Sequence, residues 1–172
     1  MRFLDTPEWK ALVAERTAAP PARLSRATWD AASLKVATSD APELIELVEK
    51  ADPGQAQLAH GLLIQAERAG RAFVAPELKV IWIAKFFERE QAALSEWLKA
   101  PSSDSLSALY DRVICHLPPG TLIDQVIARC GPPTSGGEYG SSHGPSCWYS
   151  TEDAEIYIGA DLSGVVVGWR YA

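Results

Sequence analysis

The sequence lacks long apolar runs, a signal-like start and a disulfide framework. No apolar run approaches the roughly 20 residues that a transmembrane helix needs, and the first residues, Met1–Pro7, contain no apolar signal core. The chain of 172 residues has 3 cysteines, and an odd number suits a reducing compartment better than paired disulfides. We therefore expect a cytoplasmic protein that has no membrane partner.

Basic residues are scarce in the last part of the chain. Residues 101–172 contain three of them, Arg112, Arg129 and Arg170, against eight acidic residues, and the net charge of the whole chain is −6. Nucleic-acid phosphates require a basic surface, so nucleic acid is not expected as a partner. A basic protein would be steered toward such an acidic region, although the same acidity also favours solubility.

Residues suited to metal binding or nucleophilic catalysis are few and poorly spaced. The candidates are Cys115, His116, Cys130, His143 and Cys147. No Cys-x2-Cys pair occurs, and the adjacent Cys115 and His116 diverge on a helix. The spacing of His143 and Cys147 leaves open a small thiol- or metal-dependent hydrolase. Otherwise we expect no catalytic residue, no metal and no cofactor.

The apolar residues recur at helical spacing as far as about Cys130. Helix starts are indicated where a capping side chain precedes proline or an acidic residue, as at Thr6 and at Asp40. These patterns predict a helical body over residues 1–116 with five or six helices. Within it, residues 41–70 form a helical hairpin, and residues 75–99 form one central helix.

The spacing changes after Cys130, and residues 117–172 are predicted to form a helix followed by a sheet. Thr121 is expected to cap the helix, and Gly131 to end it. The Gly- and Ser-rich residues 134–145 are expected to form an exposed loop. Residues 146–150, 154–159 and 165–171 then read as three antiparallel strands, with Ile156 and Ile158 on the face opposite Tyr157. The fold class is therefore α+β, packed as one compact unit.

Aromatic residues are concentrated in the predicted sheet. The helical Trp9, Trp29, Trp82 and Trp97 are expected in the core, whereas Trp148 and Trp169 could lie in the core or on the surface. Exposed aromatic residues beside charged ones are typical of protein-binding faces. The candidate partner-binding residues are Tyr139, Trp148, Tyr149, Glu152, Asp153, Glu155 and Tyr157.

Residues 117–171 resemble the small helix-and-sheet module that the outer-membrane lipoprotein assembly factors share with the β-lactamase inhibitor proteins. The resemblance rests on Gly120-Thr121, Val126, Gly131-Pro132, the glycine-rich stretch and Trp148-Tyr149, followed by two strands. It covers about a third of the chain, which lacks a lipoprotein signal, a tandem copy and any counterpart to the helical body. It implies a sheet whose outer face grips another protein, and it brings no catalytic residue.

These observations favour a non-catalytic, cytoplasmic protein-binding module. The most concrete version is an inhibitor, immunity protein or antitoxin that neutralises a basic toxin or enzyme. Two alternatives remain: the hydrolase built on Cys147 and His143, and a helical adaptor or scaffold that uses residues 41–70.

Overall fold

The protein is an α+β protein made of two compact units. The computed structural model describes residues 2–18, 25–69, 76–137 and 144–172. Its internal contacts divide the chain into a unit of residues 1–85 and a unit of residues 86–172. The division falls inside helix α5 (Pro76–Arg89), so the boundary expected between residues 116 and 117 does not match it. None of the described helices is both long and apolar enough to cross a membrane.

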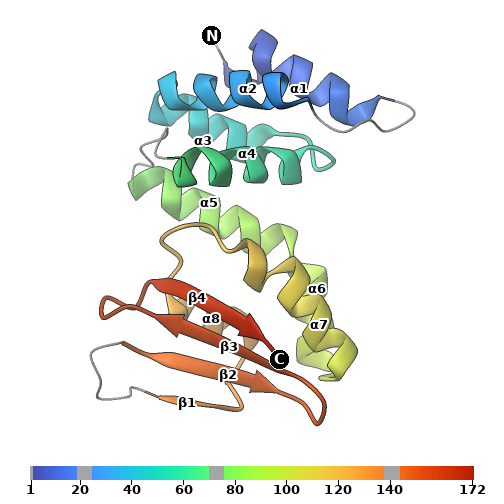
Figure 1. Cartoon of the computed structure of the whole chain (residues 1–172), viewed down its shortest axis with the longest axis vertical. Coiled ribbons are helices and arrows are strands. Elements are labelled where there is room, and N and C mark those ends of the chain that lie inside the picture. The colour runs from blue at the N-terminus through green and yellow to red at the C-terminus, as the bar shows by residue number, and fades with distance from the viewer. Residues whose placement is uncertain (1, 19–24, 70–75, 138–143) are drawn as a thin grey trace. The chain divides into compact units, whose positions relative to one another are not determined.

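The first unit is helical, and its helices begin at the predicted signals. The Trp9 N–H donates to Thr6 Oγ1 at 3.3 Å, and Asp40 and Glu43 exchange side-chain and backbone hydrogen bonds in a capping box. The elements of this unit, which Figure 1 shows in blue and green, are η1 (Phe3–Asp5), α1 (Pro7–Thr17), α2 (Arg26–Thr38), α3 (Ala41–Lys50), α4 (Ala56–Arg68) and the first part of α5.

A single apolar cluster holds these helices together. It includes residues from η1, from α1 to α4 and from α5, with Leu12, Leu47 and Leu62 completely buried. The expected core positions of Trp9 and Trp82 are confirmed, because both indoles are buried, whereas Trp29 is half-buried against the cluster. The helical periodicity of the sequence therefore identified most of this core.

One polar contact lies within the apolar core of this unit. The indole Nε1 of Trp82 donates to Nδ1 of His60 at 2.8 Å, and the two rings meet edge to face at 5.6 Å. Both side chains are buried. A ring nitrogen that accepts a hydrogen bond carries no proton, so this contact defines the His60 tautomer.

The second unit begins with a series of helices. They are the end of α5, α6 (Gln91–Lys99), α7 (Ser103–Arg112), η2 (Ile114–His116) and α8 (Ile123–Cys130). The single helix expected over residues 75–99 is two helices, because the ψ angle of 16° at Glu90 interrupts the α-helical path. The described part of residues 1–116 contains seven α-helices instead of five or six. Leu122, rather than Thr121, precedes the first turn of α8, and Gly131 ends that helix at a positive φ.

Within the described residues the sheet has four antiparallel strands, one more than expected. They follow the order β1 (Ser135–Gly137), β2 (Ser146–Ser150), β3 (Glu155–Ala160) and β4 (Val166–Tyr171). The extra strand β1 lies in the stretch expected to be an exposed loop. Gly136 pairs with Cys147, and a Cβ at Gly136 would come within 2.9 Å of the Cys147 Cα. Glycine at this position therefore permits close pairing with β2.

One face of the sheet is buried against helices. Cys147, Tyr149, Ile156 and Ile158 are all buried, and both α7 and α8 contact β3; in Figure 1, α8 lies behind the sheet. The predicted alternation is confirmed, since Ile156 and Ile158 point inward while Tyr157 lies on the other face. This other face is called the outer face below.

We expect the His60–Trp82 hydrogen bond to contribute measurably to stability. His60→Leu leaves the buried Trp82 N–H without this acceptor, which costs about 1–3 kcal/mol. His60→Asn places an oxygen near the position of Nδ1 and should retain part of that stability. Urea unfolding of the full chain, followed by tryptophan fluorescence, measures both changes. Equal stability of the Leu variant and the wild type would contradict this assignment.

Candidate protein-binding face

Three side chains form a row across the outer face of the sheet. Trp148 of β2 pairs with Tyr157 of β3, which in turn pairs with Arg170 of β4. The Trp148 and Tyr157 ring centroids are 5.2 Å apart, and the Arg170 guanidinium lies 5.7 Å from the centre of the Tyr157 ring. These contacts hold two half-buried aromatic rings and a cation in one continuous strip, which is called the Trp148–Tyr157–Arg170 row.

A pair of glycines lies beside this row. Gly159 and Gly168 are directly opposite each other on β3 and β4. A Cβ at Gly159 would be 2.8 Å from the Tyr157 hydroxyl oxygen, so the Tyr157 ring lies along the sheet toward Gly159. A Cβ at Gly168 would meet no atom within 4 Å. The sheet therefore presents bare backbone next to the aromatic strip.

The expected acidic residues lie at the turn between β2 and β3. Glu152 and Asp153 are exposed, and the turn is closed by a 2.8 Å hydrogen bond from the Thr151 N–H to the Ala154 carbonyl. Glu155 starts β3 and accepts a hydrogen bond from the Ser150 hydroxyl at 3.2 Å. Three carboxylates therefore lie toward the end of β3 that precedes Tyr157.

Tyr149 is not on this face, and its expected role as a surface contact is wrong. Its side chain has no exposed area, and its hydroxyl donates to the Gly131 carbonyl at 2.8 Å. Its ring meets Trp97 of α6 edge to face at 6.2 Å. Because side chains alternate along a strand, Trp148 and Tyr149 point to opposite faces. Tyr149 therefore belongs to the core.

The strand register also places Trp169 and Arg170 of β4. Trp169 pairs with Ile158 and is half-buried on the helix-covered side. Tyr139 lies outside the described residues. Arg170 was absent from the predicted set. Its place beside Tyr157 follows from the register between β3 and β4, which an irregularity at Gly159/Ala160 shifts. The period-2 pattern of β4 alone predicts the face on which Arg170 lies but not which residue of β3 it pairs with.

The cysteines near the sheet are buried and protonated at neutral pH. Burial raises the pKa of Cys147 to about 11. Burial, with a smaller effect of the neighbouring Cys147, raises the pKa of Cys130 to about 12. A nucleophile or metal ligand requires the thiolate, so these environments disfavour both roles. Among the described residues, no group of three or more His, Cys, Asp or Glu side chains could hold a metal ion; His143 lies outside them.

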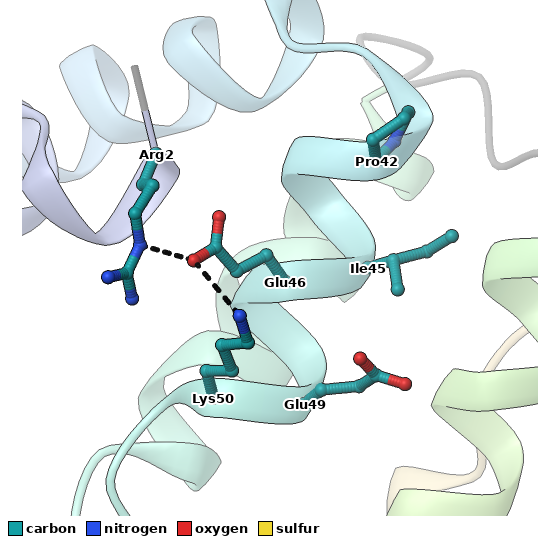
Figure 2. A pocket seen from close by; sticks show the side chains of 6 residues that line it. All are labelled: Arg2, Pro42, Ile45, Glu46, Glu49 and Lys50. Carbon is teal, nitrogen blue, oxygen red and sulfur yellow. Dashed lines mark hydrogen bonds and ion pairs between the residues drawn. The ribbon is translucent and has the colours of Figure 1, made fainter.

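A pocket of about 430 Å³ lies in the first unit. It lies beside α3 and is lined by Arg2, Pro42, Ile45, Glu46, Glu49 and Lys50. Figure 2 shows Arg2 and Lys50 both directed at Glu46, with which they form ion pairs. The four charged side chains sum to zero, and these contacts tie the N-terminal segment to α3. We interpret the pocket as part of that structural junction.

Comparisons with known proteins identify no relative of this chain. No family model, no curated protein and no solved structure matches it. The resemblance of residues 117–171 to the lipoprotein assembly and β-lactamase inhibitor module therefore stays a prediction. The candidate face rests on the geometry of the row, the glycines and the acidic turn.

We expect the three thiols to react at very different rates. Cys115 is half-buried, whereas Cys130 and Cys147 are buried. A pKa two units above the ordinary value lowers the thiolate fraction of Cys147 about 100-fold. Titration with a thiol reagent at pH 8 should thus detect one fast thiol in the folded protein and three after unfolding. Cys115→Ala should remove the fast one; rapid labelling of Cys147 in folded protein would refute the assignment.

Stability should fall at alkaline pH because of the same burial. The folded pKa values of Cys130 and Cys147 exceed that of an unfolded thiol, so the stabilisation is complete below about pH 8.5. It is lost as pH rises toward the folded pKa values, with a slope of about 1.4 kcal/mol per pH unit for each thiol. Urea unfolding between pH 8 and 10.5 measures this slope. Replacing both Cys130 and Cys147 by alanine should reduce the slope; an unchanged slope would contradict the prediction.

Proposed function

We propose that this protein is a non-catalytic protein-binding module that acts as an inhibitor or immunity-type protein and neutralises a toxin or enzyme. The observation that carries the proposal is the Trp148–Tyr157–Arg170 row on the outer face of the sheet. Tryptophan, tyrosine and arginine are the residue types that most often dominate binding energy at protein interfaces. Here they contact one another before any partner arrives.

The contacts within the row reduce the cost of binding. A side chain that is already held in place loses less conformational entropy when a partner covers it. The Trp148 ring packs on Tyr157, and Arg170 lies over the same ring. The bare backbone at Gly168 gives a partner side chain room to approach the sheet. These features support the row as the centre of a binding face.

The charges near the row favour a basic partner. Glu152, Asp153 and Glu155 lie at one end of the sheet, within a region of three basic and eight acidic residues. Such a field speeds the approach of a positively charged protein and disfavours nucleic acid. The proposal places the protein in the cytoplasm, in keeping with its three cysteines and no disulfide framework.

The alternatives receive less support from the same residues. The hydrolase alternative requires an active thiol, and Cys147 is buried with a raised pKa. The adaptor alternative requires an exposed apolar face on residues 41–70, and Leu44, Leu47, Leu62 and Leu63 are buried in the core of the first unit. Neither alternative has an observation that favours it over protein binding by the sheet.

We expect alanine at the centre of the row to weaken partner binding strongly. Trp148→Ala or Tyr157→Ala should each cost about 2 kcal/mol or more, which is about a 30-fold loss of affinity. The assay is affinity for a partner isolated with the intact chain, and Trp29→Ala provides a half-buried tryptophan control in the first unit. Glu152→Gln with Asp153→Asn should mainly slow association and reduce its salt dependence.

The opposite pattern would overturn the proposal. If the row variants bind with unchanged rate and affinity while surface changes on α3 and α4 abolish binding, the helical adaptor alternative replaces it. Circular dichroism of each variant shows whether it remains folded, so that loss of binding can be assigned to the altered side chain.

A further inference from the structure

The edge of β4 that faces away from β3 is called the β4 edge. At the start of the strand, this edge is paired with another segment of the same chain. The Val166 N–H donates to the Thr121 carbonyl at 2.9 Å, and the Ile123 N–H donates to the Gly164 carbonyl at 2.8 Å. Between them, Leu122 forms an antiparallel bridge with Val165. This short pairing ends where α8 begins. Beyond that point, residues 121–123 no longer cover the β4 edge.

Further along β4, the hydrogen-bond alternation turns backbone groups away from β3. Glu155 and Ala172 exchange two hydrogen bonds, of 2.8 and 2.9 Å, and so form a hydrogen-bonded pair. In an antiparallel ladder such pairs alternate with non-bonded pairs. Trp169 and Tyr171 occupy the non-bonded positions, opposite Ile158 and Ile156. Their N–H and C=O groups therefore point outward, and within the described residues they have no backbone partner on that side.

Exposed apolar side chains collect along the same edge. Seven large hydrophobic residues are exposed in the described part of the chain, and four of them lie on β4, its hairpin or the segment that pairs with it: Leu122, Leu162, Val167 and Tyr171. Val167 is 67% exposed. Edge strands are commonly protected by outward charges or by a covering element, but the charged residue of β4, Arg170, lies over the Tyr157 ring.

We propose that the β4 edge accepts an extended segment of a basic protein partner as a fifth strand. This inference rests on the proposed function, because it assumes that the ligand is a protein. Main-chain hydrogen bonds to Trp169 and Tyr171 would supply affinity, and the exposed Val167 would select an apolar side chain. The Trp148–Tyr157–Arg170 row ends on β4, so a partner on the outer face and a strand on this edge would form one continuous interface.

Charge decides between a foreign segment and a second copy of this chain. Residues 101–172 carry three basic and eight acidic residues, so pairing two β4 edges would bring two negatively charged regions together. A basic segment gains from the same field. The proposed occupant is therefore an extended peptide with alternating apolar and basic side chains.

The test uses a seven-residue peptide of alternating valine and lysine with isotope-labelled full-length protein. At ten times its Kd, the peptide should slow hydrogen exchange of the Trp169 and Tyr171 amides about tenfold and shift their NMR signals. A peptide methylated at alternate backbone nitrogens keeps its side chains but cannot donate to the edge, so it should give no such protection. Equal protection by both peptides, or no protection by either, would overturn strand addition.

Matched variants locate the site. Val167 and Val80 are 67% and 69% exposed, so Val167→Ser should weaken the peptide about fivefold, the effect of one cross-strand apolar pair, whereas Val80→Ser should not. Protection of the same amides by concentration-dependent dimerisation without peptide would overturn the choice of occupant. Peptide-induced shifts confined to Trp148 and Tyr157 would overturn the edge site while leaving the proposed function intact.

Discussion

The second unit depends on how the C-terminal end of α8 is buried. The last carbonyl groups of a helix have no partner within the helix, and burying them without donors is costly. Here the Trp97 indole donates to the Cys130 carbonyl at 3.1 Å, and the Tyr149 hydroxyl donates to the Gly131 carbonyl at 2.8 Å. Two aromatic residues thus satisfy this helix end and join α6, α8 and β2.

The position of Tyr149 determines what the outer face presents. With Tyr149 facing α8, Trp148 must face the other side, because neighbouring side chains of a strand alternate. The register then places Tyr157 and Arg170 beside it. The same enclosure accounts for the raised pKa of the Tyr149 hydroxyl, which follows chiefly from burial with smaller effects of Cys130 and Cys147. Core packing and the candidate face are therefore two consequences of one arrangement.

Local signals in the sequence predicted most of the fold. The predictions failed where the structure depends on residues that are far apart in the sequence. Helix starts at Thr6 and Asp40 were predictable because a cap involves only neighbouring residues. The break at Glu90 was not, since the apolar spacing continues across it. Strand β1 was missed because the need for glycine at position 136 is evident only from its pairing with Cys147. The adjacent aromatics Trp148 and Tyr149 were both candidate binding residues, although they point to opposite faces. Period-2 spacing separates such neighbours but does not say which one meets α8.

The glycine at position 159 determines how the side chains of the candidate face are arranged. Gly159 pairs with Gly168 across β3 and β4, and a Cβ there would come within 2.8 Å of the Tyr157 hydroxyl oxygen and 3.2 Å of the ring carbon that carries it. These atoms lie at the far end of a side chain, so a methyl group would tilt the Tyr157 ring rather than move the strand. Because Trp148 and Arg170 both contact that ring, the absence of one Cβ sets the geometry of the whole row. The inner face of the sheet can remain packed on its helices while the outer face is arranged separately.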